Sequence, residues 1–114
     1  MKVNKVKVSR IVSCFDGDTF RADIDTWPKL FGHKIPIRIR GIDCPERSSK
    51  DPDEQLTATN AHAFTKSTLI NAKEVMLENV QRGKYFRLIA DVFVDGQNLA
   101  EMLVRARLAK RLKY

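Results

Sequence analysis

Two arginines and two carboxylates stand close together in the stretch Arg-Ile-Arg-Gly-Ile-Asp-Cys-Pro-Glu in the first half of the chain. Arg38 and Arg40 alternate with isoleucines, which predicts a strand with one basic face and one apolar face. The strand leads into a turn in which Pro45 fixes the backbone between Asp43 and Glu46. Guanidinium groups and carboxylates held in one rigid corner suit the joint binding of a hard divalent cation and a phosphodiester.

The same stretch also has a purely structural interpretation, because an amphipathic edge strand followed by an Asp-x-Pro turn is common. A second acidic stretch bears on the choice. Asp-Gly between two alternating runs predicts a hairpin turn, which would account for Asp16 and Gly17 alone. Asp18 instead shares its phase with Phe20 and Ala22, the apolar residues of the following strand. Its carboxylate is therefore expected at the mouth of a barrel, where burial is costly unless a cation is bound.

The composition fits one globular domain with a basic surface. A chain of 114 residues can bury roughly two-thirds of its unfolded surface without disulfides. Its net charge of +7 and pI of about 9.7 favour a polyanionic partner such as nucleic acid, although solubility or a membrane surface would also account for them. No apolar run approaches the ~20 residues that span a bilayer. We expect a cytoplasmic protein, or a secreted or periplasmic one whose leader was removed.

The cysteines and histidines are not predicted to bind a metal. Cys14 and Cys44 lack the Cys-x-x-Cys spacing of zinc sites, so we expect free thiols in a reducing compartment. His33 falls in a polar connection and is expected to be solvated. His62 lies off the apolar stripe of a predicted helix, which also indicates a solvated side chain.

Hydrophobic periodicity predicts five strands and two helices. The strands are expected at residues 5–14, 18–24, 35–40, 74–80 and 85–94, and the helices at 53–71 and from 99 onward, after a capping box from Asn98 to Glu101. In the last strand the core face is expected to carry Phe86, Leu88, Ala90, Val92 and Val94. Residues 25–34 and 47–55 form long connections. This order predicts a mainly β, α+β fold: a five-stranded Greek-key barrel of the OB type with two helices.

The motifs in this order resemble those of the staphylococcal nuclease (thermonuclease) family, over nearly the whole chain. They are Asp16-Gly17-Asp18-Thr19, Arg38 placed five residues before Asp43-Cys44-Pro45-Glu46, Phe64-Thr65-Lys66, Asn71-Ala72-Lys73, Lys84-Tyr85-Phe86-Arg87 and the stretch from Leu99 to Lys110. The resemblance implies an OB-fold barrel and calcium-dependent hydrolysis of DNA and RNA without sequence specificity.

The resemblance assigns a role to each acidic residue of the two motifs. Asp18 and Asp43 would be carboxylate ligands of the metal, with the backbone carbonyl of Cys44 as a third ligand. Hard oxygen ligands suit Ca²⁺ or Mg²⁺, and the family favours Ca²⁺. Glu46 would be the general base that activates the attacking water.

The basic residues would hold the substrate. Arg38 and Arg87 would grip the phosphate and stabilise the transition state, which a guanidinium fork does better than an ammonium group. Lys84 and Tyr85 match family positions that contact the nucleotide's terminal phosphate.

The chain departs from the family pattern in four places. Cys44 replaces a threonine, and Phe86 replaces the glycine before the catalytic arginine, which places a large ring beside Arg87. The connection 25–34 is longer than in the family's best-known member. Residues 1–114 are expected to form one nuclease-like domain that lacks the family's C-terminal helix, and Tyr114 is a weak candidate for stacking.

Two functions remain open on the sequence. The first is a monomeric, metal-dependent nuclease that acts away from membranes. The second is a catalytically inactive OB-fold module that binds nucleic acid. The clustered carboxylates favour the nuclease, because a binding module has no need of them.

Overall fold

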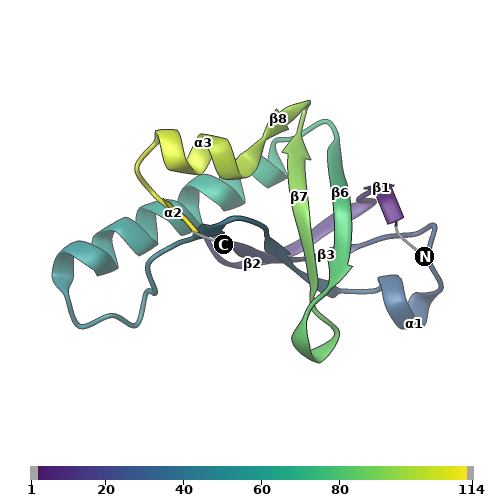
Figure 1. Ribbon diagram of the computed structural model, residues 1–114, viewed down its shortest axis with the longest axis horizontal. Coiled ribbons are helices and arrows are strands. Elements are labelled where there is room, and N and C mark those ends of the chain that lie inside the picture. The colour runs from purple at the N-terminus through teal and green to yellow at the C-terminus, as the bar shows by residue number, and fades with distance from the viewer. Residues whose placement is uncertain (1–2, 113–114) are drawn as a thin grey trace.

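The computed structural model of the protein describes residues 3–112, without the side chains of Val3, Asn4 and Tyr85. A curled sheet is covered by helices, as Figure 1 shows. The strands are β1 (Val3–Lys7), β2 (Arg10–Asp16), β3 (Thr19–Asp23), β4 (Ile35–Ile39), β5 (Ile42–Asp43), β6 (Val75–Arg82), β7 (Leu88–Val94), β8 (Gln97–Asn98) and β9 (Lys110–Arg111). The helices are α1 (Lys29–Gly32), α2 (Pro52–Ile70), the short 3₁₀ helix η1 (Lys84–Phe86) and α3 (Leu99–Arg105).

The sheet curls until its two outer strands are the halves of one bent strand. The strand order is β1-β6-β7-β4-β3-β2, and β1 and β2 follow each other directly in the chain. At the bend, the amide of Val8 donates to the carbonyl of Val75 on β6 (2.9 Å), and the amide of Ser9 donates to that of Asp23 on β3 (2.8 Å). The single strand predicted at 5–14 is therefore two strands. The predicted α+β fold with an OB-type barrel is confirmed, with β1 and β2 in place of the first predicted strand and with α1 in addition to the two predicted helices.

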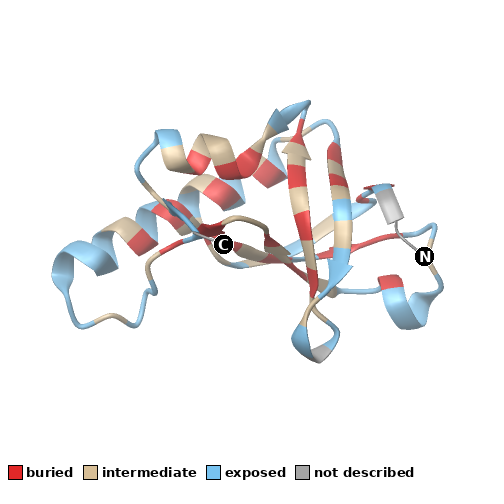
Figure 2. Ribbon diagram, in the orientation of Figure 1, coloured by how far each residue is buried: buried red, intermediate tan, exposed pale blue. Residues whose placement is uncertain are grey.

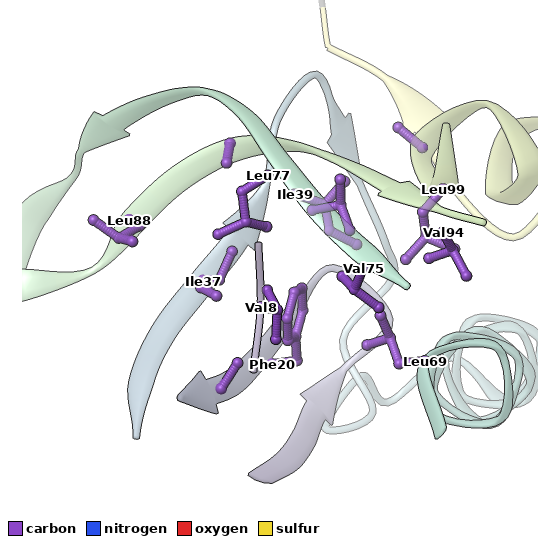
Figure 3. Close-up of a cluster of buried hydrophobic side chains, with 14 of the residues drawn as sticks. Val8, Phe20, Ile37, Ile39, Leu69, Val75, Leu77, Leu88, Val94 and Leu99 are labelled. Atoms are coloured by element: carbon purple, nitrogen blue, oxygen red, sulfur yellow. The ribbon is translucent and has the colours of Figure 1, made fainter. Parts of the chain in front are cut away.

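The barrel interior is filled by side chains that alternate along the strands. Phe20, Ile37, Ile39, Leu77 and Val92 are fully buried, and Figure 3 shows Phe20 at the centre of this cluster. Burying one such side chain contributes about 1.5–3 kcal/mol. The phase of these residues directs Arg38 on β4 to the outer face, whereas Asp18, just before β3, keeps the inward phase of Phe20.

Helix α2 lies along one side of the barrel. Asp51 caps its first turn by accepting a hydrogen bond from the amide of Asp53 (3.0 Å), and Pro52 stands at its first position. Its buried residues are Ala58, Ala61, Thr65 and Leu69, spaced by three or four residues. Figure 2 shows that much of its first half is exposed to solvent. The predicted helix 53–71 agrees with these bounds within one residue at each end.

The hairpin between β6 and β7 differs from the prediction. The sequence predicts a strand from residue 85 with Phe86 on the core face, but β7 begins at Leu88 and Phe86 is 67% exposed. A turn that includes η1 closes through a hydrogen bond from the amide of Arg87 to the carbonyl of Lys84 (3.2 Å). Phe86 adopts a φ of 64°, in the left-handed region. The alternation of apolar residues continues through Phe86, but the backbone hydrogen bonding between β6 and β7 does not.

The connection 25–34 is tied back to the sheet. It contains α1, and the amide of Lys34 donates to Asp23 at 2.8 Å. His33 was expected to be a solvated loop residue, and its side chain is 59% exposed; its Nδ1 lies 3.2 Å from the same carboxylate. The Lys34 amide, together with Arg10 and His33, holds the pKa of Asp23 below its usual range. Among the described residues, no helix is long and apolar enough to cross a membrane.

Candidate active site

Asp18 is fixed between β3 and the segment that follows β5. Its side chain is buried, with the residue only 4% exposed. One carboxylate oxygen, Oδ2, accepts a hydrogen bond from the amide of Cys44 (3.0 Å), and Oδ1 accepts one from the hydroxyl of Thr19 (3.1 Å). The backbone carbonyl of Asp18 accepts from the amide of Ile39 on β4 (2.9 Å). The inward phase predicted for this carboxylate is confirmed, and the amide of Cys44 and the hydroxyl of Thr19 set its direction.

Helix α2 holds the turn that carries Asp18. The hydroxyl of Thr65 donates to the carbonyl of Gly17 at 2.7 Å. A Cβ atom on Gly17 would lie 2.7 Å from Cβ of Ala61 and 2.9 Å from Sγ of Cys44, so only glycine allows the helix this close. His62 was predicted to be solvated, but its Nε2 lies 2.8 Å from the carbonyl of Cys14. Neither contact was predictable from the sequence, because Thr65 and His62 both occupy ordinary helix positions.

Arg38 joins the two acidic segments. Its Nη1 lies 3.3 Å from Oδ2 of Asp18, and its Nη2 lies 3.4 Å from Oδ1 of Asp43. The side chain of Asp43 is 61% exposed, so this second ion pair is screened by water and contributes little to stability. The structure therefore brings Asp18, Arg38, Asp43 and Cys44 together, as the sequence predicts.

Arg40 does not share this corner. Its Nη1 lies 3.4 Å from Oδ2 of Asp91, and its Nη2 donates to the carbonyls of Ile89 (3.3 Å) and Asn79. The expectation that both arginines of the strand face the carboxylates is wrong. A strand with both side chains on one face still separates them along its length, and β6 and β7 supply closer partners to Arg40.

Arg87 stands just before β7 with an unsatisfied donor. In the parallel pairing of β4 with β7, Arg38 is opposite Ile89, and Arg87 lies two residues before Ile89. The alternation along the strand therefore places Arg87 on the same face of the sheet as Arg38. Its Nε is buried and has no hydrogen-bond partner among the described residues. An unsatisfied buried donor is costly, and a phosphate oxygen would satisfy it.

Glu46 lies on the exposed side of the corner. It lines a hollow of about 540 Å³ together with Phe15, Asp16, Arg47 and Ser48. The hydroxyl of Ser48 lies 3.4 Å from its Oε2. Among the contacts of the described residues, none joins Glu46 to Asp18, Arg38 or Asp43, so the structure leaves its predicted role open.

The remaining predicted residues are only partly described. Lys84 is exposed on η1, and the side chain of Tyr85 lies outside the described residues, as does Tyr114. In the described part of the chain, no three His, Cys, Asp or Glu side chains converge on one point as metal ligands. Cys14 and Cys44 are free thiols. Burial raises the pKa of the Cys44 thiol to about 12, and the carboxylates of Asp18 and Asp43 add to the effect.

Comparison with known proteins settles the family. The family model described as Staphylococcal nuclease homologue matches residues 36–114. The chain belongs to the staphylococcal nuclease family. It is 32% identical over 98 residues to Endonuclease YncB of Bacillus subtilis (strain 168), covering 83% of this chain and 43% of that protein. It is 27% identical over 106 residues to Thermonuclease of Staphylococcus hyicus, covering 92% of this chain and 59% of that protein.

A third relative is the SPbeta prophage-derived endonuclease YokF of Bacillus subtilis (strain 168), which is 32% identical over 98 residues. The alignment covers 83% of this chain and 31% of that relative. The chain thus spans less than two-thirds of the length of each of these three proteins.

Proposed function

We propose that the protein is a nuclease that hydrolyses phosphodiester bonds of DNA and RNA. The observation that carries the proposal is the convergence of Asp18 and Asp43, from two separate segments, on the guanidinium of Arg38. A buried carboxylate beside a second carboxylate and an arginine is an arrangement for binding a cation and a phosphate together. The net charge of +7 supports a polyanionic substrate held without sequence preference.

The donor set fits a hard divalent cation. The carboxylates of Asp18 and Asp43 and the carbonyl of Cys44 would hold Ca²⁺, which takes 6–8 oxygen ligands, so water and substrate would supply the others. When bound, the ion would supply positive charge to the non-bridging phosphate oxygens.

The side chains of this chain perform the remaining steps. Glu46 takes the proton of the attacking water. Arg38 and Arg87 donate to the equatorial oxygens of the phosphate, whose negative charge grows in the transition state. Lys84 and Tyr85 hold a terminal phosphate at the tip of the β6–β7 hairpin. The unsatisfied Nε of Arg87 supports its part in this scheme.

The test is degradation of plasmid DNA and of RNA by the purified protein in Ca²⁺, in Mg²⁺ and in chelator. We expect degradation in Ca²⁺ and none in chelator. Glu46→Gln is expected to lower the rate by several orders of magnitude and to preserve binding, because the base is lost and the shape is kept. Glu74→Gln, just before β6 and outside the hollow that contains Glu46, is the matched control.

Equal degradation in all three conditions would exclude the metal mechanism. Binding without degradation in any condition would favour the alternative, an inactive OB-fold module that binds nucleic acid.

A further inference from the structure

An exposed aromatic ring stands beside Glu46 and has no part in the scheme above. Phe15, at the end of β2, is 65% exposed. The guanidinium carbon of Arg47 lies 6.0 Å from the centre of its ring. Arg47 is itself anchored, since its Nη2 donates to the carbonyl of Phe15 (2.5 Å) and its Nε lies 3.5 Å from Oδ1 of Asp16. Ring and guanidinium thus form a fixed pair at the surface.

Two hollows meet at this pair. The first, of about 540 Å³, contains Glu46. The second, of about 630 Å³, shares Phe15 and Arg47 with the first and extends over β2, β3 and α2. Each is large enough to admit a nucleotide-sized ligand. A nucleic-acid strand that passes Glu46 can therefore cross the Phe15–Arg47 pair and enter the second hollow.

The second hollow is basic as well as apolar. Arg21 and Lys66 line it with Arg47, and no acidic side chain of the described residues is part of its lining. Val12, which is partly exposed, adds apolar surface next to Phe15. The imidazole of His62 lies at its wall with Nε2 against the carbonyl of Cys14. Cations arranged beside an aromatic ring are the elements with which proteins hold single-stranded nucleic acid.

We propose that Phe15 and Arg47 form a stacking platform for one base of a single-stranded DNA or RNA substrate. The base would belong to the nucleotide next to the scissile phosphate on the Glu46 side, and Arg21 and Lys66 would hold the following backbone phosphate. A base within a duplex is stacked between its neighbours and cannot lie on the ring, so the platform selects unpaired strands. This subsite rests on the proposed function for its position relative to the scissile bond, but not for its ability to bind.

The test is the binding of a fluorescent ten-nucleotide single strand, measured by anisotropy in chelator so that no cleavage occurs. Phe15→Ala is expected to weaken binding by about 5- to 150-fold, the loss of one base stack. Phe15→Tyr keeps an aromatic face and should bind like the wild type. The matched control is Phe31→Ala, because Phe31 is 53% exposed on α1, outside both hollows. Thermal unfolding of each variant verifies the fold.

Salt dependence separates stacking from charge. Lys66→Ala is expected to reduce the slope of log Kd against log salt by about 0.7, the value for one phosphate contact to a single strand. Phe15→Ala should leave the slope unchanged, and so should Lys29→Ala on α1.

The platform would be overturned by unchanged single-strand binding in Phe15→Ala, or by equal weakening of binding to a blunt duplex. The same holds if the wild type binds no oligonucleotide. Phe15-dependent binding by a wild type that cleaves nothing would refute the proposed nuclease and leave the platform standing. Cleavage that does not depend on Phe15 would refute the platform and leave the proposed nuclease standing.

Discussion

At the scale of single residues, Arg38 has the most demanding position. One guanidinium reaches carboxylates that lie 25 positions apart in the sequence, because its planar fork offers separate nitrogens to Asp18 and Asp43. Its neighbour Arg40 has the same side chain but forms an ion pair with Asp91 and donates hydrogen bonds to two backbone carbonyls. The two arginines differ in their partners because they lie at different places along the strand.

Replacing Arg38 by lysine should therefore impair catalysis even though the charge is kept. An ammonium group cannot bind two phosphate oxygens in one plane, and removing one preorganised donor costs about 2.7–4 kcal/mol of transition-state stabilisation, about 100- to 1,000-fold in kcat/KM. The measurement is cleavage of a fluorogenic oligonucleotide in Ca²⁺, with Arg105→Lys on α3 as the control. An unchanged kcat/KM would remove Arg38 from the mechanism.

Phe86 occupies a left-handed backbone position, with a φ of 64°. Such a conformation costs an L-residue about 1–2 kcal/mol relative to glycine. We expect Phe86→Gly to be more stable than Phe86→Ala by about 1 kcal/mol, the reverse of the order in a regular strand or helix. Urea denaturation of the two variants measures the difference. If alanine were equal to or better than glycine, the left-handed turn would be wrong.

The buried thiol of Cys14 predicts a pH dependence. Burial is the main cause that raises the pKa of Cys14, to about 11. In the unfolded chain the thiol ionises near pH 9 or below, so between that pH and 11 the unfolded state binds fewer protons than the folded state. The free energy of unfolding then falls as pH rises. Relative to Cys14→Ala, the wild type should lose stability from pH 9 to 11 and be constant from pH 6 to 8. A constant difference across the whole range would contradict this.

At the scale of elements, helix α2 is the part that positions the acidic turn. Its hydroxyl, imidazole and methyl groups reach Gly17 and Cys14, which lie on the turn or on the strand before it. The helix itself was predictable from its apolar stripe, but its polar contacts were not, because Thr65 is read as one more stripe residue until the turn packs against it. The position of the acidic turn therefore depends on which backbone carbonyl each polar side chain of the helix contacts.

Thr65→Val should uncouple the helix from the turn. The carbonyl of Gly17 would lose its buried partner, at a cost of about 1–3 kcal/mol. Thr65→Ser keeps the hydroxyl and should retain much of the stability. Thr68→Val is the matched control, because the hydroxyl of Thr68 donates to the carbonyl of Phe64 within the same helix. Urea denaturation and kcat/KM report the two effects. Equal losses in the Thr65 and Thr68 valine variants would show that the Gly17 contact is unimportant.

The hairpin between β6 and β7 marks where sequence patterns stop being sufficient. Alternation correctly places Leu88, Ala90, Val92 and Val94 in the core, because one face of that strand is buried throughout. It also places Phe86 in the core, because alternation shows which face a side chain would take and not where strand pairing stops. The hydrogen bond from the amide of Arg87 to the carbonyl of Lys84 forms a turn, so the strand begins only after Phe86.

At the scale of the whole molecule, the barrel converts dispersed residues into one site. The turn after β2, the end of β4, the segment after β5 and the start of β7 meet on one side because β4 is the common neighbour of β3 and β7. The meeting of Asp18, Arg38 and Asp43 was predicted because the motifs resemble those of the nuclease family. The pairing of the strands, with β7 between β6 and β4, does not follow from their order in the chain. The Phe15–Arg47 pair was not foreseen, because a phenylalanine beside an Asp-Gly turn looks like a core residue until its exposure is known.

Metal binding should be visible in the stability of the whole fold. An ion that binds only the folded state adds about 2.7 kcal/mol when its concentration is 100 times the Kd. We therefore expect Ca²⁺ to raise the Tm relative to chelator, and to do so more than Mg²⁺ at equal concentration, because an incomplete cage of flexible oxygens suits the larger ion. Asp18→Asn should abolish the increase, because the amide lacks the charge that holds the ion. Asp91→Asn, whose carboxylate pairs with Arg40 on the outer face, should retain it. The measurement is calorimetry in the absence of nucleic acid, so a Tm that is the same in Ca²⁺ and in chelator would refute the metal site whatever the enzyme activity.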